Sequence, residues 1–161
     1  MSSTQPTSAE SIAGQRDAFI ERFLQFASGT FSLFSIYIGD RRGLYRALTE
    51  GGPATSAELA SRTGTQERYI REWLEQQTVA GILRVENENH STESRRFSLP
   101  AGHAEPLIDC NSLNYMVPLA QLLVGATRPL PAVLEAYRNG GGVPFDDYGA
   151  DLREGQAAIN Y

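Results

Sequence analysis

Lysine is absent from this sequence of 161 residues, and all 14 cationic side chains are arginines. The absence excludes Schiff-base chemistry and a P-loop, because both need a lysine amine. The single cysteine, Cys110, cannot pair within the chain, which indicates a reducing, cytoplasmic location. His90 and His103 stand apart, and a zinc site needs three or four ligands, so no metal site is expected.

Long apolar runs are also missing. No stretch approaches the roughly 18 apolar residues that cross a bilayer, and the N-terminus has neither the basic flank nor the apolar segment of a secretion signal. No membrane association is therefore expected. The formal net charge of −5 argues against nucleic acid as a partner, since non-specific affinity for phosphate comes from cationic side chains.

The N-terminal part predicts helices. Residues 1–10 are polar and predict a disordered leader. Helical spacing begins at residue 11, and Gly29 predicts an interruption before a second helix that ends near Asp40. Nearly every position of this second helix is apolar, aromatic or small, which is more than one core-facing stripe requires. Residues 11–42 are therefore predicted to be dimerisation helices, with burial inside their own domain as the alternative. The predicted interface residues are Phe31, Phe34, Tyr37 and Ile38.

Residues 43–100 predict three short helices followed by a two-stranded wing. The first helix carries Leu44, Tyr45 and Leu48, and the second begins with a capping box at residues 55–58. Thr65 is expected to cap the third helix, residues 66–80, with apolar positions at 69, 70, 73 and 74. Strands are expected at 82–85 and 96–99, joined by an exposed loop. The predicted fold class is mainly α: a winged helix-turn-helix with a small two-stranded wing plus flanking N- and C-terminal helices.

The charges of the third helix argue against DNA binding. Its predicted outward positions hold two Arg and three Glu, and the acidic side chains would lie close to phosphate. Residues 41–100 hold nine Arg and eight acidic residues. Nucleic acid is therefore an unlikely partner, and a winged helix used for packing or dimerisation is favoured.

Residues 101–161 predict helices again. His103 is expected in a loop after Pro100, and Cys110 is expected to be structural. Helices are predicted at 112–124, with a kink or start at Pro118, at 129–138, and from about Gly149. The 129–138 helix is expected to bury Leu130, Val133, Leu134 and Tyr137, and the glycines at 140–142 are expected to form a joint rather than a phosphate loop.

Aromatic and acidic residues cluster at 144–148. Two aromatic rings and two carboxylates lie in this segment, and residues 143–161 hold four acidic residues against one Arg. Such a lip fits a small-molecule pocket for a cationic or hydroxylated ligand. A solvated helix start explains the same residues equally well.

Three blocks of the sequence resemble the N-terminal region of bacterial class I S-adenosylmethionine-dependent methyltransferases. They are Ile38–Leu48, Thr55–Ala60, and Glu67–Gln77 with Ala80–Leu83. Val143–Gly149, with residues 154–157 and Asn160, resembles the connector to the catalytic domain of that family. The resemblance covers about residues 11–161.

The resemblance implies a winged-helix domain that precedes a Rossmann-like catalytic domain. In this family the N-terminal helices supply a dimer interface and one wall of the pocket for a small-molecule methyl acceptor. The implied wall residues are Phe145, Tyr148 and Gln156, with Tyr115 as a further candidate. Residues 101–161 would then form a helical connector and substrate lid.

The sequence departs from the family at the cofactor. S-adenosylmethionine is implied for the full-length family, but the acidic-x-Gly-x-Gly-x-Gly loop that holds it is missing, so no catalytic or cofactor-binding residue is assigned here. The expected function is an N-terminal dimerisation and substrate-lid module, inactive alone and without the catalytic domain. The alternatives are a stand-alone winged-helix transcriptional regulator that binds DNA and a small effector, and a binding protein that holds a small ligand between residues 112 and 161.

Overall fold

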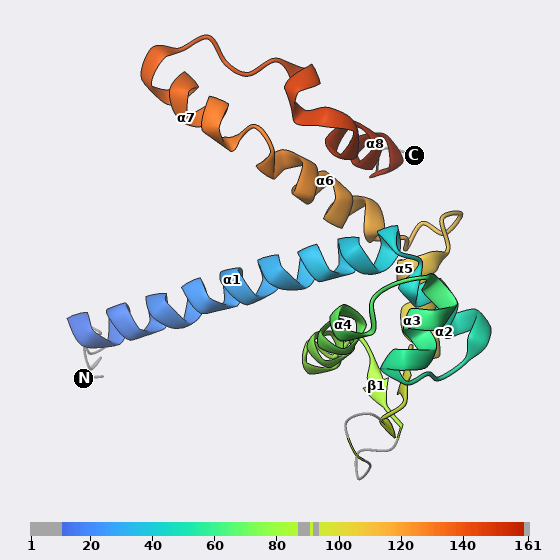
Figure 1. Ribbon diagram of the computed structural model, residues 1–161. Helices are drawn as coiled ribbons and strands as arrows, with labels where there is room; N and C mark the ends of the chain where they lie inside the picture. Colours follow the sequence, from blue (N-terminus) through green and yellow to red (C-terminus); the bar gives the residue numbers. More distant parts are fainter. Residues whose placement is uncertain (1–10, 87–90, 92–93, 160–161) are drawn as a thin grey trace, which may run out of the picture. The chain divides into compact units, whose positions relative to one another are not determined.

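The computed structural model describes residues 11–86, 91 and 94–159 (Figure 1). The predicted leader at 1–10, His90, and Asn160 of the predicted connector lie outside these residues. The described part is mainly helical. Its elements are α1 (Ile12–Arg41), α2 (Leu44–Gly51), α3 (Ser56–Thr63), α4 (Glu67–Val79), β1 (Arg84–Val85), β2 (Phe97–Ser98), α5 (Ala101–Ile108), α6 (Val117–Thr127), α7 (Leu130–Asn139), a 3-10 helix η2 (Phe145–Tyr148) and α8 (Gly149–Ile159).

The long helix α1 is continuous, so the expected interruption at Gly29 is wrong. Glycine weakens a helix interior by roughly 1 kcal/mol relative to alanine but does not end it. At the next position, the Thr30 hydroxyl donates to the carbonyl of Phe26 at 2.8 Å, as a helical Thr does. The chain divides into two compact units, Met1–Phe31 and Ser32–Tyr161, and the boundary falls within α1.

The winged-helix core forms around α2, α3 and α4. Its apolar side chains follow the helical spacing of the sequence, and α3 packs against α4. The buried apolar side chains of this core are Leu44, Tyr45, Leu48, Ala54, Leu59, Ala60, Ile70, Trp73, Leu74, Leu83 and Phe97.

The predicted capping box is present at the start of α3. The Thr55 hydroxyl accepts from the Glu58 amide at 3.2 Å, and the Glu58 carboxylate accepts from the Thr55 amide at 2.9 Å. Gly64 ends the helix with φ of 63°, a left-handed conformation that glycine adopts without strain. These local signals therefore fix both ends of α3.

The end of α1 that belongs to the second unit packs on α2 and α4 through an aromatic pair. The Tyr45 and Trp73 rings meet edge to face, with centroids 5.2 Å apart. The Trp73 indole N–H donates to the carbonyl of Ser35 at 2.9 Å, and the Tyr45 hydroxyl donates to the buried Gln77 amide oxygen. Gly39 lies against both rings, where a Cβ atom would be 2.6 Å from each.

Helix α4 begins differently from the prediction. Its N-cap is Gln66 rather than Thr65, whose hydroxyl instead shares a 2.8 Å hydrogen bond with that of Thr63. Tyr69 is 75% exposed, so the expectation that it packs inward is wrong. Ile70, Trp73 and the following Leu fill the apolar face without it.

The wing is an antiparallel pair of strands, as predicted, but each is only two residues long. Arg84 pairs with Ser98, and Val85 pairs with Phe97. Phe97 also bridges to Ala54, which ties the wing to the segment before α3. Most of the predicted loop between the strands lies at residues 87–90 and 92–93, outside the described part of the chain.

Helix α5 is absent from the sequence expectations, which placed His103 in a loop. Pro106 lies inside it, and this residue hides the helical pattern because proline disfavours helix interiors. The His103 Nδ1 lies 2.9 Å from the carbonyl oxygen of Ile82, so the helix is anchored to the turn before β1. Residues 112–116 are not helical, and Pro118 marks the start of α6 rather than a kink.

Helices α6 and α8 lie side by side (Figure 1) and make the most extensive contact between elements in the described part. Two glycines allow it. A Cβ atom at Gly125 would lie 2.3 Å from the Leu152 backbone nitrogen, and one at Gly155 would lie 2.7 Å from the Leu122 nitrogen. The two backbones therefore approach more closely than any side chain would permit.

Helix α7 exposes the face that the sequence predicted to be buried. Leu130, Leu134 and Tyr137 are exposed, and Val133 is half-buried. The amphipathic pattern correctly identifies the helix but not what covers it. Within the described residues, no single helix is long and apolar enough to cross a membrane. Helices α6 and α7 together have that length and apolar character, but the chain bends by 55° between them.

Candidate functional site

The outward face of α4 is occupied by ion pairs. The Arg71 guanidinium donates to both carboxylate oxygens of Glu67, at 3.0 and 2.8 Å, and the Ser56 hydroxyl donates to the same carboxylate at 2.6 Å. The hydrogen bonds from Ser56 and then Arg71 lower the pKa of Glu67. Arg71 is thus held by an acid on its own helix, one turn away.

The arginines at the base of the wing are also paired. Arg95 contacts Glu75 of α4 at 3.0 Å. Arg96 contacts Glu58 at 2.9 Å and donates to the carbonyl of Pro53 at 2.6 Å. These pairs fasten the wing to α3 and α4. They also pair with carboxylates the guanidinium groups that a contact with phosphate would need. That the winged helix packs rather than binds DNA stays a prediction.

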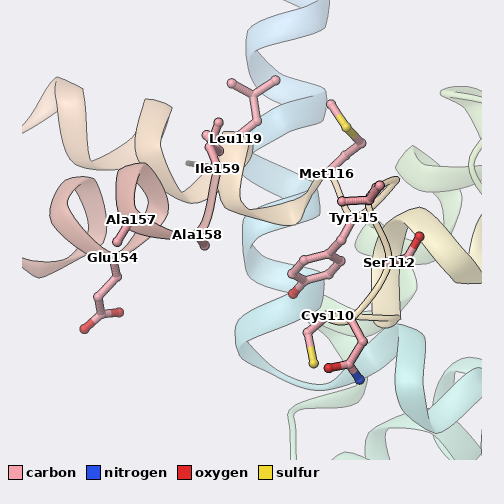
Figure 2. A pocket seen from close by; sticks show the side chains of 11 residues that line it. Cys110, Ser112, Tyr115, Met116, Leu119, Glu154, Ala157, Ala158 and Ile159 are labelled. Atoms are coloured by element: carbon pink, nitrogen blue, oxygen red, sulfur yellow. The ribbon is translucent and has the colours of Figure 1, made fainter. Parts of the chain in front are cut away.

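A cleft of about 780 Å³ opens between the loop after α5 and the ends of α6 and α8. Figure 2 shows the Tyr115 ring and the Cys110 thiol extending from the loop in the same direction, while the Glu154 carboxylate points away from them. The walls are mostly apolar, as is usual for a small-molecule site. The lining residues are Cys110, Asn111, Ser112, Leu113, Tyr115, Met116, Leu119, Glu154, Ala157, Ala158 and Ile159.

Tyr115 shares the electrostatic environment of Asp40 at the end of α1. Burial, then the negative charge of Asp40, raises the pKa of the Tyr115 hydroxyl. Burial also raises the pKa of Asp40, against the opposing charges of Arg41 and Arg46. Tyr115 therefore keeps its proton at neutral pH and offers the cleft a hydrogen-bond donor.

A polar junction ties α8 to the end of α1. The Tyr37 hydroxyl donates to Asp151 at 2.9 Å, and the Arg41 guanidinium donates to the other carboxylate oxygen at 2.6 Å. Burial raises the pKa of Asp151, but these two hydrogen bonds outweigh burial and hold the pKa below its usual value. Gln121 of α6 donates to Glu154 at 3.0 Å and extends the junction to the cleft. No sequence signal pointed to it, because its members are separated by more than 100 positions.

The four predicted wall residues do not line one cavity. Tyr115 lines the cleft, and Gln156 is exposed on α8 next to lining residues. Tyr148 lines a separate hollow beside α7, and the Phe145 ring lies 6.4 Å from the Tyr148 ring. Their assignment to one substrate wall stays a prediction.

The four predicted interface residues lie along α1. Phe31 and Ile38 are exposed, and Phe34 and Tyr37 are half-buried. The Tyr37 ring also lies under the Arg41 guanidinium, 5.3 Å from its carbon atom. The role of all four in a dimer stays a prediction.

The described residues do not fit S-adenosylmethionine as the family binds it. That site needs a glycine loop directly after a strand, whereas the glycines at 140–142 follow helix α7 and the described strands are two residues long. Among the described residues, no three His, Cys, Asp or Glu side chains are grouped to hold a metal ion. No chemical step is therefore assigned to this chain.

The helix order, the capped turn and the paired strands define a winged helix-turn-helix protein with flanking helices. Residues 30–108, just under half of the chain, match the family described as the Rv2258c-like winged HTH domain. These residues are an Rv2258c-like winged HTH domain.

Two further comparisons complete the findings. The chain is similar to the solved structure of the mitomycin 7-O-methyltransferase MmcR, with 21% sequence identity and a TM-score of 0.66. The match covers 92% of this chain and 45% of that one, so this chain spans less than half the length of the structure it resembles. The fold therefore agrees with the N-terminal region of such an enzyme, as expected from the sequence. No curated protein matches the sequence.

Proposed function

We propose that this chain is the N-terminal dimerisation and substrate-lid module of an S-adenosylmethionine-dependent methyltransferase and does not transfer methyl groups by itself. The observation that carries the proposal is the fold match to MmcR, which extends over 92% of this chain but 45% of that enzyme. In the proposal, the cofactor is held by a Rossmann-like domain, and this cytoplasmic chain contributes a surface toward a small-molecule methyl acceptor.

The exposed face of α1 supports the dimer part of the proposal. Six large apolar residues on it are 48–67% exposed: Phe19, Ile20, Phe23, Leu24, Phe26 and Phe31. Together they present roughly 700 Å² of apolar surface, close to the ~800 Å² that each partner of a stable complex buries. The opposite side holds Glu21 and Gln25, so the helix has one side suited to a second copy.

The lid part of the proposal is supported by the cleft and by the connection of α8. Tyr115 supplies a hydroxyl within an apolar wall, and the Tyr37–Asp151 hydrogen bond connects α8 to α1. An acceptor bound in the cleft would thus contact α8, which is tied to the end of α1 that belongs to the second unit. Of the three connector residues that the resemblance implies, Gln156 lies next to lining residues of this cleft, whereas Phe145 and Tyr148 lie at a separate hollow.

Sedimentation velocity at micromolar concentration tests the dimer. The wild-type chain should sediment as a dimer, and Phe23→Asp should sediment as a monomer because it places a charge on the apolar face. Gln25→Asp, on the polar face, is the matched control and should remain dimeric. Phe34→Asp tests the predicted interface itself, with circular dichroism to confirm that it folds. A monomeric wild type would contradict the proposal.

Calorimetric titration with S-adenosylmethionine tests the proposal that the cofactor binds to a separate catalytic domain and not to this chain. The chain should show no binding heat, because the described residues lack the loop that the family uses. Tight binding by this chain would overturn the module interpretation and leave the dimer measurement unaffected.

A further inference from the structure

A second hollow, of about 420 Å³, lies between α7 and the segment that returns to α8. It shares no lining residue with the cleft at Tyr115. The glycines at 140–142 create it: their φ angles of 74°, 90° and 73° turn the chain back so that Val143 and Tyr148 face α7. The lining residues are Val133, Ala136, Tyr137, Gly142, Val143 and Tyr148.

Aromatic rings form a large part of this hollow. Tyr137 contributes from α7 and Tyr148 from η2, and Phe145 adds a third ring 6.4 Å from that of Tyr148. The face of an aromatic ring carries partial negative charge and attracts cations. The remaining wall is aliphatic, so it suits methyl groups rather than a hydrated ion.

Charged side chains of both signs surround the hollow, and the Arg128 guanidinium lies at Gly149, next to Tyr148. Both arginines on the flanking helices are held by acids: Arg138 contacts Glu135 at 3.5 Å, and Arg153 contacts Asp146 at 3.6 Å. The neighbouring Asp147 adds a further exposed carboxylate on η2. The hollow therefore has a rim of mixed charge, and its aromatic and aliphatic wall is the feature that favours a methylated cation.

We propose that this hollow binds an organic cation of the methylated ammonium class. The methyl groups would lie against Val133 and Val143, the charge would lie over the rings of Tyr137 and Tyr148, and Asp147 would add long-range attraction. The inference rests on the proposed function only in that Tyr148 is both a predicted wall residue of the acceptor pocket and a lining residue of this hollow. It is tested on this chain alone, whereas the dimer and the cofactor titration test the module.

Choline and its neutral carbon analogue, 3,3-dimethylbutan-1-ol, provide the test. The two have nearly the same shape, so a difference in affinity reports the charge. Titration followed by two-dimensional ¹H–¹⁵N spectra should move amide signals of residues 133–148. Two ring contacts predict that choline binds roughly five- to thirtyfold more tightly than the alcohol. Equal affinity, or no shifts with choline, would overturn the proposal.

Substitutions of the tyrosines separate the ring from its hydrophobic area. Tyr137→Leu and Tyr148→Leu should each reduce the preference for choline severalfold, whereas the corresponding changes to Phe should retain it because the ring remains. Tyr69→Leu, at an exposed tyrosine of α4 that does not line the hollow, is the control and should change nothing. If the Leu variants keep the full preference, the assignment to this hollow is wrong.

Discussion

Gly125 and Gly155 set the distance between α6 and α8. Each lies directly against backbone of the other helix, and neither has a left-handed φ angle, so the need is for space rather than for backbone freedom. The sequence offers no reason to distinguish them from other helical glycines such as Gly29, which has nothing within 4 Å of its Cβ position.

Gly155→Ala is expected to lower the free energy of unfolding by roughly 1–3 kcal/mol. The added methyl group would lie 2.7 Å from the Leu122 nitrogen and 2.8 Å from the Pro118 carbonyl oxygen, and backbone atoms yield less easily than side chains. Urea unfolding followed by circular dichroism measures the change.

Gly29→Ala is the matched control for this substitution. It also adds a methyl group to a helix interior, but into open space, so it should be neutral or stabilising by up to about 1 kcal/mol. Equal destabilisation by the two variants would show that the close approach of α6 and α8 is not what Gly155 provides.

Among the elements, α3 is the one whose boundaries follow most directly from local sequence. Thr55 and Glu58 satisfy each other's backbone amides, and Arg96, the residue before β2, contacts the same carboxylate. The capping box therefore also anchors the wing. The hydrogen bond from the Thr55 amide, and then the one from Arg96, hold the pKa of Glu58 below its ordinary value of 4.5.

Thr55→Ala is expected to cost about 1 kcal/mol of unfolding free energy at neutral pH, because the Glu58 amide loses its acceptor. Thr49→Ala is the control, since the Thr49 hydroxyl donates a hydrogen bond to the carbonyl of Tyr45 in its own helix and caps no helix end. Urea unfolding compares the two.

The same site predicts a pH dependence. A carboxyl whose pKa is lower in the folded state adds stability above its unfolded pKa and loses that contribution as pH falls through its folded pKa. Wild-type stability should therefore decline below about pH 4.5, and Glu58→Gln should show a shallower decline. Parallel declines of the two proteins in acid would contradict the assignment.

Helices α7 and α5 show what local sequence patterns do not predict. Helix α7 has the predicted apolar spacing, but Leu134 is 67% exposed, because spacing reports an amphipathic face and not its partner. Helix α5 was not predicted because Pro106 interrupts its helical pattern in the sequence. In the folded chain the contact between His103 and the Ile82 carbonyl anchors this helix.

For the whole molecule, the distribution of charge bears on the choice between the proposed module and a DNA-binding regulator. The wing and α4 carry arginines, but Arg71, Arg95 and Arg96 each contact a glutamate. Counterion release requires cations that are available to phosphate. These ion pairs, like the negative net charge, therefore favour the proposed module over a DNA-binding regulator.

A gel-shift assay against random and fragmented genomic duplexes should show no specific retention by the wild-type chain. The variant Glu67→Gln/Glu75→Gln removes the acids that hold Arg71 and Arg95, so weak, salt-dependent binding should appear, with a salt slope steeper by up to about two charges. Specific wild-type retention that weakens steeply with salt would support the regulator instead.

The sequence by itself determined the elements of the winged helix. Helical spacing, the capping box, and the glycines that end α2 and α3 act over a few residues, so they can be read without knowing the fold. The resemblance to methyltransferases rests on the same contiguous blocks. These local signals were enough for the fold class and for the ends of α2 and α3.

Only the tertiary structure decided the contacts that join distant segments. The Tyr37–Asp151 hydrogen bond, the pairing of Arg95 with Glu75, and the close approach at Gly155 link residues whose chain separation hides them. It also separated Tyr115 and Tyr148 into two cavities. The physical reason is that packing and charge pairing depend on which surfaces meet, and a one-dimensional pattern shows only which surfaces exist.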